Sequence, residues 1–157
     1  RMNESFAISI LEGKRAKYVA RDQKLRISSR LLRAGDSLPA HCSAPGKVLL
    51  AALTLDELNN LLETDQPLEQ CTEQSITDIA ELKECLRKVR LQSWGTAEDE
   101  FELGMIAIAV PVFDQQGRVV AAMSVGSTKQ RRTVDELREE FLPVLQDAAE
   151  KLSSQMT

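Results

Sequence analysis

The stretch MIAIAVPVFDQQGRVVAAMSVGS, residues 105–127, decides the fold. Its two arms, residues 105–113 and 118–127, are almost continuously apolar, and the polar turn DQQG separates them. A strand with one solvated face alternates apolar and polar residues, whereas a nearly continuous apolar strand is covered on both faces. The stretch therefore predicts a hairpin that is buried between two layers of other structure.

A second hairpin is expected near the start of the chain. Phe6, Ile8 and Ile10 alternate along SFAISILEG, and AKYVAR follows after a Gly-Lys-Arg turn, so residues 5–21 are typical of two paired strands. A short third strand, LRIS at residues 25–28, is expected next.

Helix start signals lie between the two hairpins and after the second one. Three pairs have the spacing of a capping box, a polar residue followed by an acidic one three positions on: Thr54 with Glu57, Ser75 with Asp78, and Thr133 with Glu136. Strands, helices, strands and a last helix are the order of an α+β domain, an antiparallel sheet covered by helices.

The stretch LPAHCSAPGKVLLAAL, residues 38–53, predicts a helix that begins after Ser43 as its N-cap, with Pro45 in the first turn. Gly46 is unusual there, because Gly inside a helix costs roughly 0.8–1 kcal/mol relative to Ala. Two explanations are open. A ligand carboxylate approaches the helix N-terminus, which attracts anions, or the helix packs tightly on a strand.

The only histidine, His41, precedes one of the three cysteines, Cys42. In an extended segment neighbouring side chains point to opposite sides, so we expect no nucleophile–base pair. His41, Cys42, Cys71 and Cys85 also lack the spacing of a zinc site. We therefore expect no metal and no cofactor.

The acidic run EDEFELG precedes the buried hairpin. On a strand Glu98, Glu100 and Glu102 would share one face, opposite Asp99. Two interpretations are open, a solvated edge or a carboxylate that accepts a hydrogen bond from a ligand hydroxyl.

Composition narrows the class of protein. The chain has 157 residues, enough for one domain, and a formal net charge of −4, which argues against direct binding of nucleic acid. Its longest apolar run, residues 105–113, is about half of the ~20 residues that a membrane-spanning helix requires. Three cysteines without framework spacing favour reduced thiols in the cytoplasm, and no membrane partner is expected.

Three segments together resemble the effector-binding domain of IclR-type bacterial transcriptional regulators, in family order and at family spacing. They are NESFAISILEG with AKYVAR, then LPAHCSAPGKVLLAAL, then EDEFELGMIAIAVPVFDQQGRVVAAMSVGS. The first segment is most similar to the subgroup that controls the breakdown of aromatic acids through protocatechuate and β-ketoadipate. The resemblance implies a GAF-like fold, an antiparallel sheet flanked by helices, with a small-molecule pocket on one face.

The resemblance also implies which residues line that pocket, namely the loop entering the first helix, the acidic run and the last two strands. Carried onto this chain, these are Ser43, Ala44, Pro45 and Gly46, Glu98 or Asp99, Ala107, and Ser124 with Gly126. Pro45 removes a backbone donor that many members have, and Ala107 stands where some have a Cys.

A small organic acid, aromatic or dicarboxylic, is the effector that these residue types favour. The Ser124 hydroxyl and the first-turn amides are candidates to hold its carboxylate, and Ile106, Ile108 and Val110 are candidate apolar walls. Arg21 is either a counter-ion or an exposed charge at a strand end.

We expect a ligand-sensing regulatory domain without catalytic activity that self-associates to a dimer or tetramer. It would reach DNA only through a winged helix-turn-helix domain that precedes Arg1 in the full protein. The alternative is a small cytosolic enzyme that uses Cys42 or the carboxylates of residues 98–102.

Overall fold

The computed structural model describes residues 4–21, 34–63 and 67–155. In these ranges the chain forms six strands, four α-helices and one 3-10 turn. The strands are β1 (Ser5–Glu12), β2 (Arg15–Arg21), β3 (Ser37–Pro39), β4 (Gly95–Glu98), β5 (Met105–Phe113) and β6 (Val119–Thr128). The 3-10 turn is η1 (Ala40–Cys42), and the helices are α1 (Ala44–Ala51), α2 (Leu55–Leu62), α3 (Ile79–Gln92) and α4 (Val134–Ser153).

All six strands form one antiparallel sheet in the order β3-β2-β1-β6-β5-β4. Both predicted hairpins are confirmed: β5 pairs with β6 and β1 pairs with β2. The third strand predicted at residues 25–28 lies outside the described residues. A strand that was not predicted, β3, pairs with β2 at the edge of the sheet.

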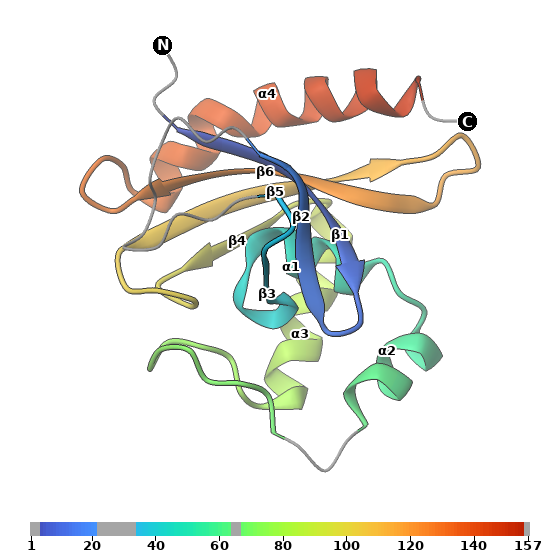
Figure 1. Cartoon of the computed structure of the whole chain (residues 1–157), viewed down its shortest axis with the longest axis vertical. Coiled ribbons are helices and arrows are strands. Elements are labelled where there is room, and N and C mark those ends of the chain that lie inside the picture. The colour runs from blue at the N-terminus through green and yellow to red at the C-terminus, as the bar shows by residue number, and fades with distance from the viewer. Residues whose placement is uncertain (1–3, 22–33, 64–66, 156–157) are drawn as a thin grey trace.

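The sheet is covered on both faces, as the apolar hairpin predicted (Figure 1). On one face Ile108 and Val110 of β5 pack with Phe141 and Leu137 of α4 in one core cluster. The interpretation of Ile108 and Val110 as walls of a ligand pocket was therefore wrong, because period-two alternation turns both toward α4. The architecture is the α+β class expected, an antiparallel sheet flanked by helices.

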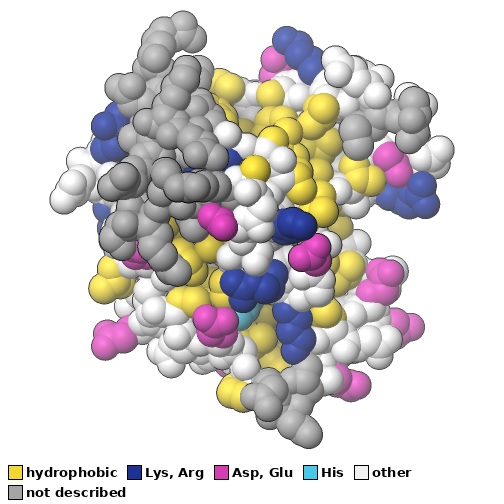
Figure 2. All heavy atoms as spheres, viewed as in Figure 1, with side chains coloured by type: hydrophobic (Ala, Val, Ile, Leu, Met, Phe, Trp, Pro, Cys, Tyr) yellow, Lys and Arg dark blue, Asp and Glu magenta, His cyan; other side chains and the backbone are white. Residues whose placement is uncertain are grey.

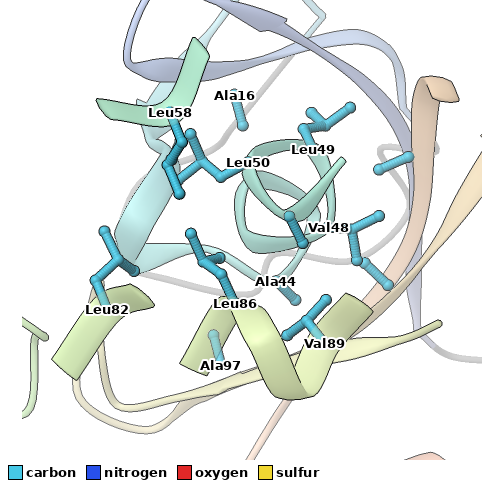
Figure 3. Close-up of a cluster of buried hydrophobic side chains, with 14 of the residues drawn as sticks. Ala16, Ala44, Val48, Leu49, Leu50, Leu58, Leu82, Leu86, Val89 and Ala97 are labelled. Atoms are coloured by element: carbon cyan, nitrogen blue, oxygen red, sulfur yellow. The ribbon is translucent and has the colours of Figure 1, made fainter. Parts of the chain in front are cut away.

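The other face of the sheet carries α1, with α3 packed outside it (Figure 3). Val48 and Leu50 of α1 lie against Leu86 and Val89 of α3 in this second core. The sheet and the start of α1 contribute small side chains to the same cluster, Ala44, Ala97, Ala109 and Ala122. Such small residues let the helix approach the strands closely, and this places the N-terminus of α1 directly on the sheet.

Two of the three predicted capping boxes are present. Thr54 begins α2 and Thr133 begins α4, each with its reciprocal glutamate. At α3 the prediction was wrong, because Asp78 is the N-cap and accepts a hydrogen bond from the Glu81 backbone N–H (2.9 Å). Ser75 instead lies in the loop before α3, where its hydroxyl accepts hydrogen bonds from backbone N–H groups of the same loop.

Charges of both signs are interspersed over the face shown in Figure 2, and neither sign dominates it. None of the helices in the described part of the chain is long and apolar enough to pass through a lipid bilayer.

Candidate functional site

A small cavity lies where the N-terminus of α1 meets the sheet, on the face opposite α4. Six residues of the predicted set line it, Ser43, Ala44, Pro45, Ala107, Ser124 and Gly126. The other lining residues are Ser5, Tyr18, Arg21, Leu38, Cys42, Ala97, Glu100, Phe101, Met105 and Ile106. The cavity volume is about 20 Å³, which is room for little more than one water molecule.

The start of α1 forms one wall. The Ser43 hydroxyl accepts a hydrogen bond from the Gly46 backbone N–H (3.0 Å), so the predicted N-cap is confirmed. That bond occupies one first-turn amide, and Pro45 has none to offer. The first turn therefore holds an anion less readily than its position suggested.

Gly46 does not line the cavity. A Cβ atom at this position would overlap the backbone of Ala40 in η1 and would lie 2.6 Å from the Ala40 carbonyl carbon. Of the two explanations for this glycine, close packing is the one that the structure supports. The neighbour is the 3-10 turn rather than a strand.

Three strands form the floor of the cavity. Ala107 of β5 pairs with Gly126 of β6, and Gly126 pairs in turn with Ser5 of β1. Ser124 lies two residues before Gly126 on β6, so both project from the same face of the sheet. Small side chains here leave a hollow in the sheet face, and the two serines contribute hydroxyl groups to it.

Arg21 lines the cavity, so its position fits a counter-ion better than a strand-end charge in solvent. Its guanidinium carbon lies 4.6 Å from the ring centroid of Tyr18, over the face of the ring. Burial raises the pKa of the Tyr18 hydroxyl, and the neighbouring Arg21 partly opposes this rise. The site therefore combines a cation with a neutral, buried phenol.

The acidic run does not continue as a strand. Asp99 has a positive φ of 61°, which ends the two-residue alternation and turns the chain. Asp99 and Glu98 both pair with Lys129 (2.8 and 3.0 Å), and neither lines the cavity. The hydrogen bond from Lys129, together with the Gly104 backbone N–H, holds the pKa of Asp99 below its usual range. These two carboxylates therefore stabilise the turn at Asp99 by pairing with Lys129.

Glu100 is the acidic residue that reaches the cavity. Its Oε2 atom lies 2.7 Å from the Lys47 ammonium, which also donates to the Thr96 carbonyl oxygen (3.0 Å). Both side chains of this ion pair are largely buried, with 3% of Lys47 and 12% of Glu100 exposed. Within the described residues the other oxygen, Oε1, has no hydrogen-bond partner. Glu100 thus brings an unused acceptor to the site.

His41 and Cys42 lie in the η1 turn, so the extended backbone expected for them was wrong. His41 hydrogen-bonds through Nε2 to the Glu69 carbonyl oxygen (2.7 Å), and Cys42 lines the cavity. The helical turn also brings the two side chains into contact with each other. No group of three or more His, Cys, Asp or Glu side chains in the described ranges is placed to hold a metal ion.

Several site residues were missed from sequence. Ser5 and Tyr18 lie in the predicted hairpin, where successive side chains point to opposite faces of the sheet. Strand periodicity could therefore have placed both on one face. Leu38 and Phe101 carried no comparable signal, because Leu38 lies in the three-residue strand β3, which is too short to show alternation, and Phe101 lies in the irregular loop between β4 and β5.

Comparison with known proteins gives a consistent result. Residues 1–154 match the family described as Bacterial transcriptional regulator IclR C-terminal. The chain is 35% identical over 156 residues to the Pca regulon regulatory protein of Pseudomonas putida, covering 99% of this chain and 53% of that protein. It is 36% identical over 135 residues to the p-hydroxybenzoate hydroxylase transcriptional activator of Acinetobacter baylyi, covering 86% and 49%. The chain spans about half the length of these curated relatives.

A solved structure with the same fold contains a ligand. It is the inducer-binding domain of a double mutant of the PobR transcription factor from Acinetobacter, in complex with 3-hydroxybenzoic acid. The match has a TM-score of 0.89 and 33% sequence identity, and it covers 97% of this chain and 89% of that one. The family and these relatives are transcriptional regulators and not enzymes, which argues against the alternative of a small cytosolic enzyme.

Proposed function

This chain belongs to the C-terminal domain family of the IclR-type bacterial transcriptional regulators, and we propose that its cavity binds a small aromatic acid as the effector of such a regulator. The complex of the related inducer-binding domain with 3-hydroxybenzoic acid supports this class of ligand. So does the resemblance to regulators named for the pca genes and for p-hydroxybenzoate hydroxylase.

The observation that carries the proposal is the set of polar groups in the cavity. Arg21 supplies a cation for a carboxylate, and Ser5 and Ser124 supply hydroxyl groups from the floor. Glu100 enters from the loop after β4, which is one edge strand of the sheet, whereas Arg21 lies on β2, next to the opposite edge strand β3. Its unpartnered Oε1 suits a ligand hydroxyl. Carboxylate and hydroxyl on one ring match these groups.

The size of the cavity bears on how binding is transmitted. An apolar cavity of roughly 150 Å³ accommodates benzene, whereas this one holds about 20 Å³. An aromatic acid therefore enters only if lining side chains and the elements that carry them move apart. The ligand favours the arrangement with the wider cavity, and such differential binding is how an effector shifts a conformational equilibrium.

Calorimetric titration of residues 1–157 with benzoate, 3-hydroxybenzoate, protocatechuate and adipate tests the proposal, with phenol as the ligand without a carboxylate. Arg21→Met removes the cation, and Ser124→Ala removes a hydroxyl. We expect each to weaken binding of the preferred acid by tenfold or more, because a hydrogen bond to a charged group contributes roughly 1.5–3 kcal/mol.

The matched control is Arg118→Met, which removes an exposed arginine that pairs with Asp114 in the β5–β6 turn, away from the cavity. It should leave the affinity unchanged. Failure of every acid to bind, or equal affinity of the Arg21 and Arg118 variants, would contradict the proposal.

The complete regulator is proposed to work in the cytoplasm as a dimer or tetramer that contacts DNA through a separate N-terminal domain. The face shown in Figure 2 carries charges of both signs. This agrees with DNA contact through a separate domain, because direct phosphate binding requires a concentrated basic patch. Effector binding here would then bias the arrangement of the DNA-binding domains, with couplings of about 1–3 kcal/mol in typical allosteric proteins.

A further inference from the structure

Two thiols meet beside the cavity, and effector binding does not account for them. Cys42 lies in η1 and is fully buried, and Cys71 lies 29 positions later in the loop between α2 and α3, half-buried. Their sulfur atoms are 3.7 Å apart. A disulfide has its sulfurs at about 2.05 Å, so an approach of roughly 1.7 Å closes the bond.

The loop that carries Cys71 is held against η1. The Ser75 hydroxyl accepts from the backbone N–H groups of Cys71 and Thr72 (3.0 Å each) and donates to the Glu100 carbonyl oxygen (2.6 Å). Ser75 Oγ also lies 3.7 Å from Cys42 Sγ. The two thiols are therefore neighbours because a defined hydrogen-bond network positions them.

His41 distinguishes the two thiols chemically. Burial acts to raise the pKa of Cys42, but the hydrogen bond and the charge of His41, together with hydrogen bonds to Ser75 and Cys71, outweigh it and lower that pKa below its usual range. Burial, followed by the proximity of Cys42, raises the pKa of Cys71 to about 12. A thiolate is the nucleophile in oxidation chemistry, so Cys42 is suited to attack first and Cys71 to react second.

We propose that Cys42 and Cys71 form a reversible redox site, in which a hydroperoxide oxidises the two thiols to a disulfide. Cys42 borders the cavity, whose volume leaves room for a molecule little larger than water. Cys71 is half-buried. The site takes a small peroxide as its oxidant.

The reaction has two steps. The Cys42 thiolate attacks the terminal oxygen of the hydroperoxide, the O–O bond breaks, and the departing alkoxide or hydroxide takes a proton, leaving Cys42 as a sulfenic acid. The Cys71 sulfur then attacks Cys42 Sγ, the S–O bond breaks, and the released hydroxide takes the Cys71 proton to form water. The thiols lose two electrons and two protons, and the hydroperoxide is reduced to an alcohol, or to water, plus water.

Oxidation of residues 1–157 with a small excess of hydrogen peroxide tests the proposal. Free thiols are then blocked with N-ethylmaleimide, and the protein is digested without reductant for mass spectrometry. Before blocking, we expect the intact mass to fall by two hydrogen atoms. After digestion we expect a peptide that joins Cys42 to Cys71, and dithiothreitol should reverse the oxidation.

The third cysteine provides the matched control, because Cys85 of α3 packs beside the α1 core and is also half-buried. Cys85→Ser should leave the cross-link unchanged. In Cys71→Ser the reaction should stop at a Cys42 sulfenic acid that dimedone captures, and in Cys42→Ser the Cys71 thiol should survive the treatment.

The His41 contribution has its own readout. In His41→Asn the pH profile for oxidation of Cys42 by hydrogen peroxide should move to higher pH, with the rate near neutral pH reduced about tenfold. Unreacted wild-type thiols, equal oxidation of Cys85, or oxidation of Cys71 at the wild-type rate in Cys42→Ser would each overturn the proposal.

Discussion

Replacing Gly46 by Ala is expected to lower the free energy of unfolding by about 2–3 kcal/mol. The new methyl group would overlap the Ala40 backbone, and its distance from the Ala40 carbonyl carbon would be 2.6 Å where ordinary contact begins at 3.4 Å. The two buried segments must separate by more than 0.8 Å to accept it, because the Ala40 carbonyl oxygen and Cα would lie nearer still. Overpacking of this kind typically costs 1–3 kcal/mol and sometimes more, and a rigid backbone neighbour places Gly46 at the upper end.

An opposite effect limits the loss, since Ala is favoured over Gly inside a helix by roughly 1 kcal/mol. Urea unfolding followed by the fluorescence of Trp94, the only tryptophan, measures the balance. Gly95→Ala is the matched control, because its Cβ would meet only methyl groups of Val89 and Val48 at 3.3–3.5 Å. We expect that variant within about 1 kcal/mol of wild type. A Gly46→Ala protein as stable as the control would refute the packing explanation.

Four further outcomes are expected. Lys47→Met leaves the Glu100 carboxylate buried without its cation and should cost about 3 kcal/mol in urea unfolding, and adding Glu100→Gln should recover part of that loss. Glu4→Gln breaks the ion pair between the buried Glu4 carboxylate and Arg132. Arg132 keeps Glu140 as a second carboxylate partner, so a smaller loss of about 2 kcal/mol is expected in the same assay. The free energy of unfolding of peroxide-treated protein with Cys42 joined to Cys71 should be about 3–4 kcal/mol higher than that of reduced protein, because the disulfide closes a loop of about 29 residues. Sedimentation of residues 1–157 at roughly tens of micromolar should show a dimer or tetramer, and a monomer alone would contradict the proposed self-association.

Much of the sheet could be predicted because period-two patterns and turn residues act locally. The arms of residues 105–127 are apolar at nearly every position, and the structure places one face of β5 on α4 and the other on α1. The N-caps Ser43, Thr54 and Thr133 are also local, since each side chain bonds a backbone amide three residues on. Such features depend on spacing alone.

The candidate site was harder to predict because it depends on where regular structure stops. Alternation along a strand cannot distinguish Glu98 from Glu100. The positive φ of Asp99 turns the chain between them, so that Glu100 reaches the cavity and Glu98 does not. Gly46 likewise carried a correct signal of close approach without naming its neighbour. That neighbour, Ala40, lies in a 3-10 turn that no apolar periodicity marks.

One wall of the cavity connects the two proposed chemistries. The Glu100 carboxylate borders the cavity, while its carbonyl oxygen accepts from the Ser75 hydroxyl, and that hydroxyl lies beside Cys42. A ligand that displaces Glu100 therefore also acts on the network that holds the two thiols together. Conversely, a bond between Cys42 and Cys71 draws the loop before α3 toward η1 and restricts the movement that a larger cavity requires. By the reciprocity of linked equilibria, an acid that binds the reduced form more tightly also makes the disulfide harder to form, by the same free energy.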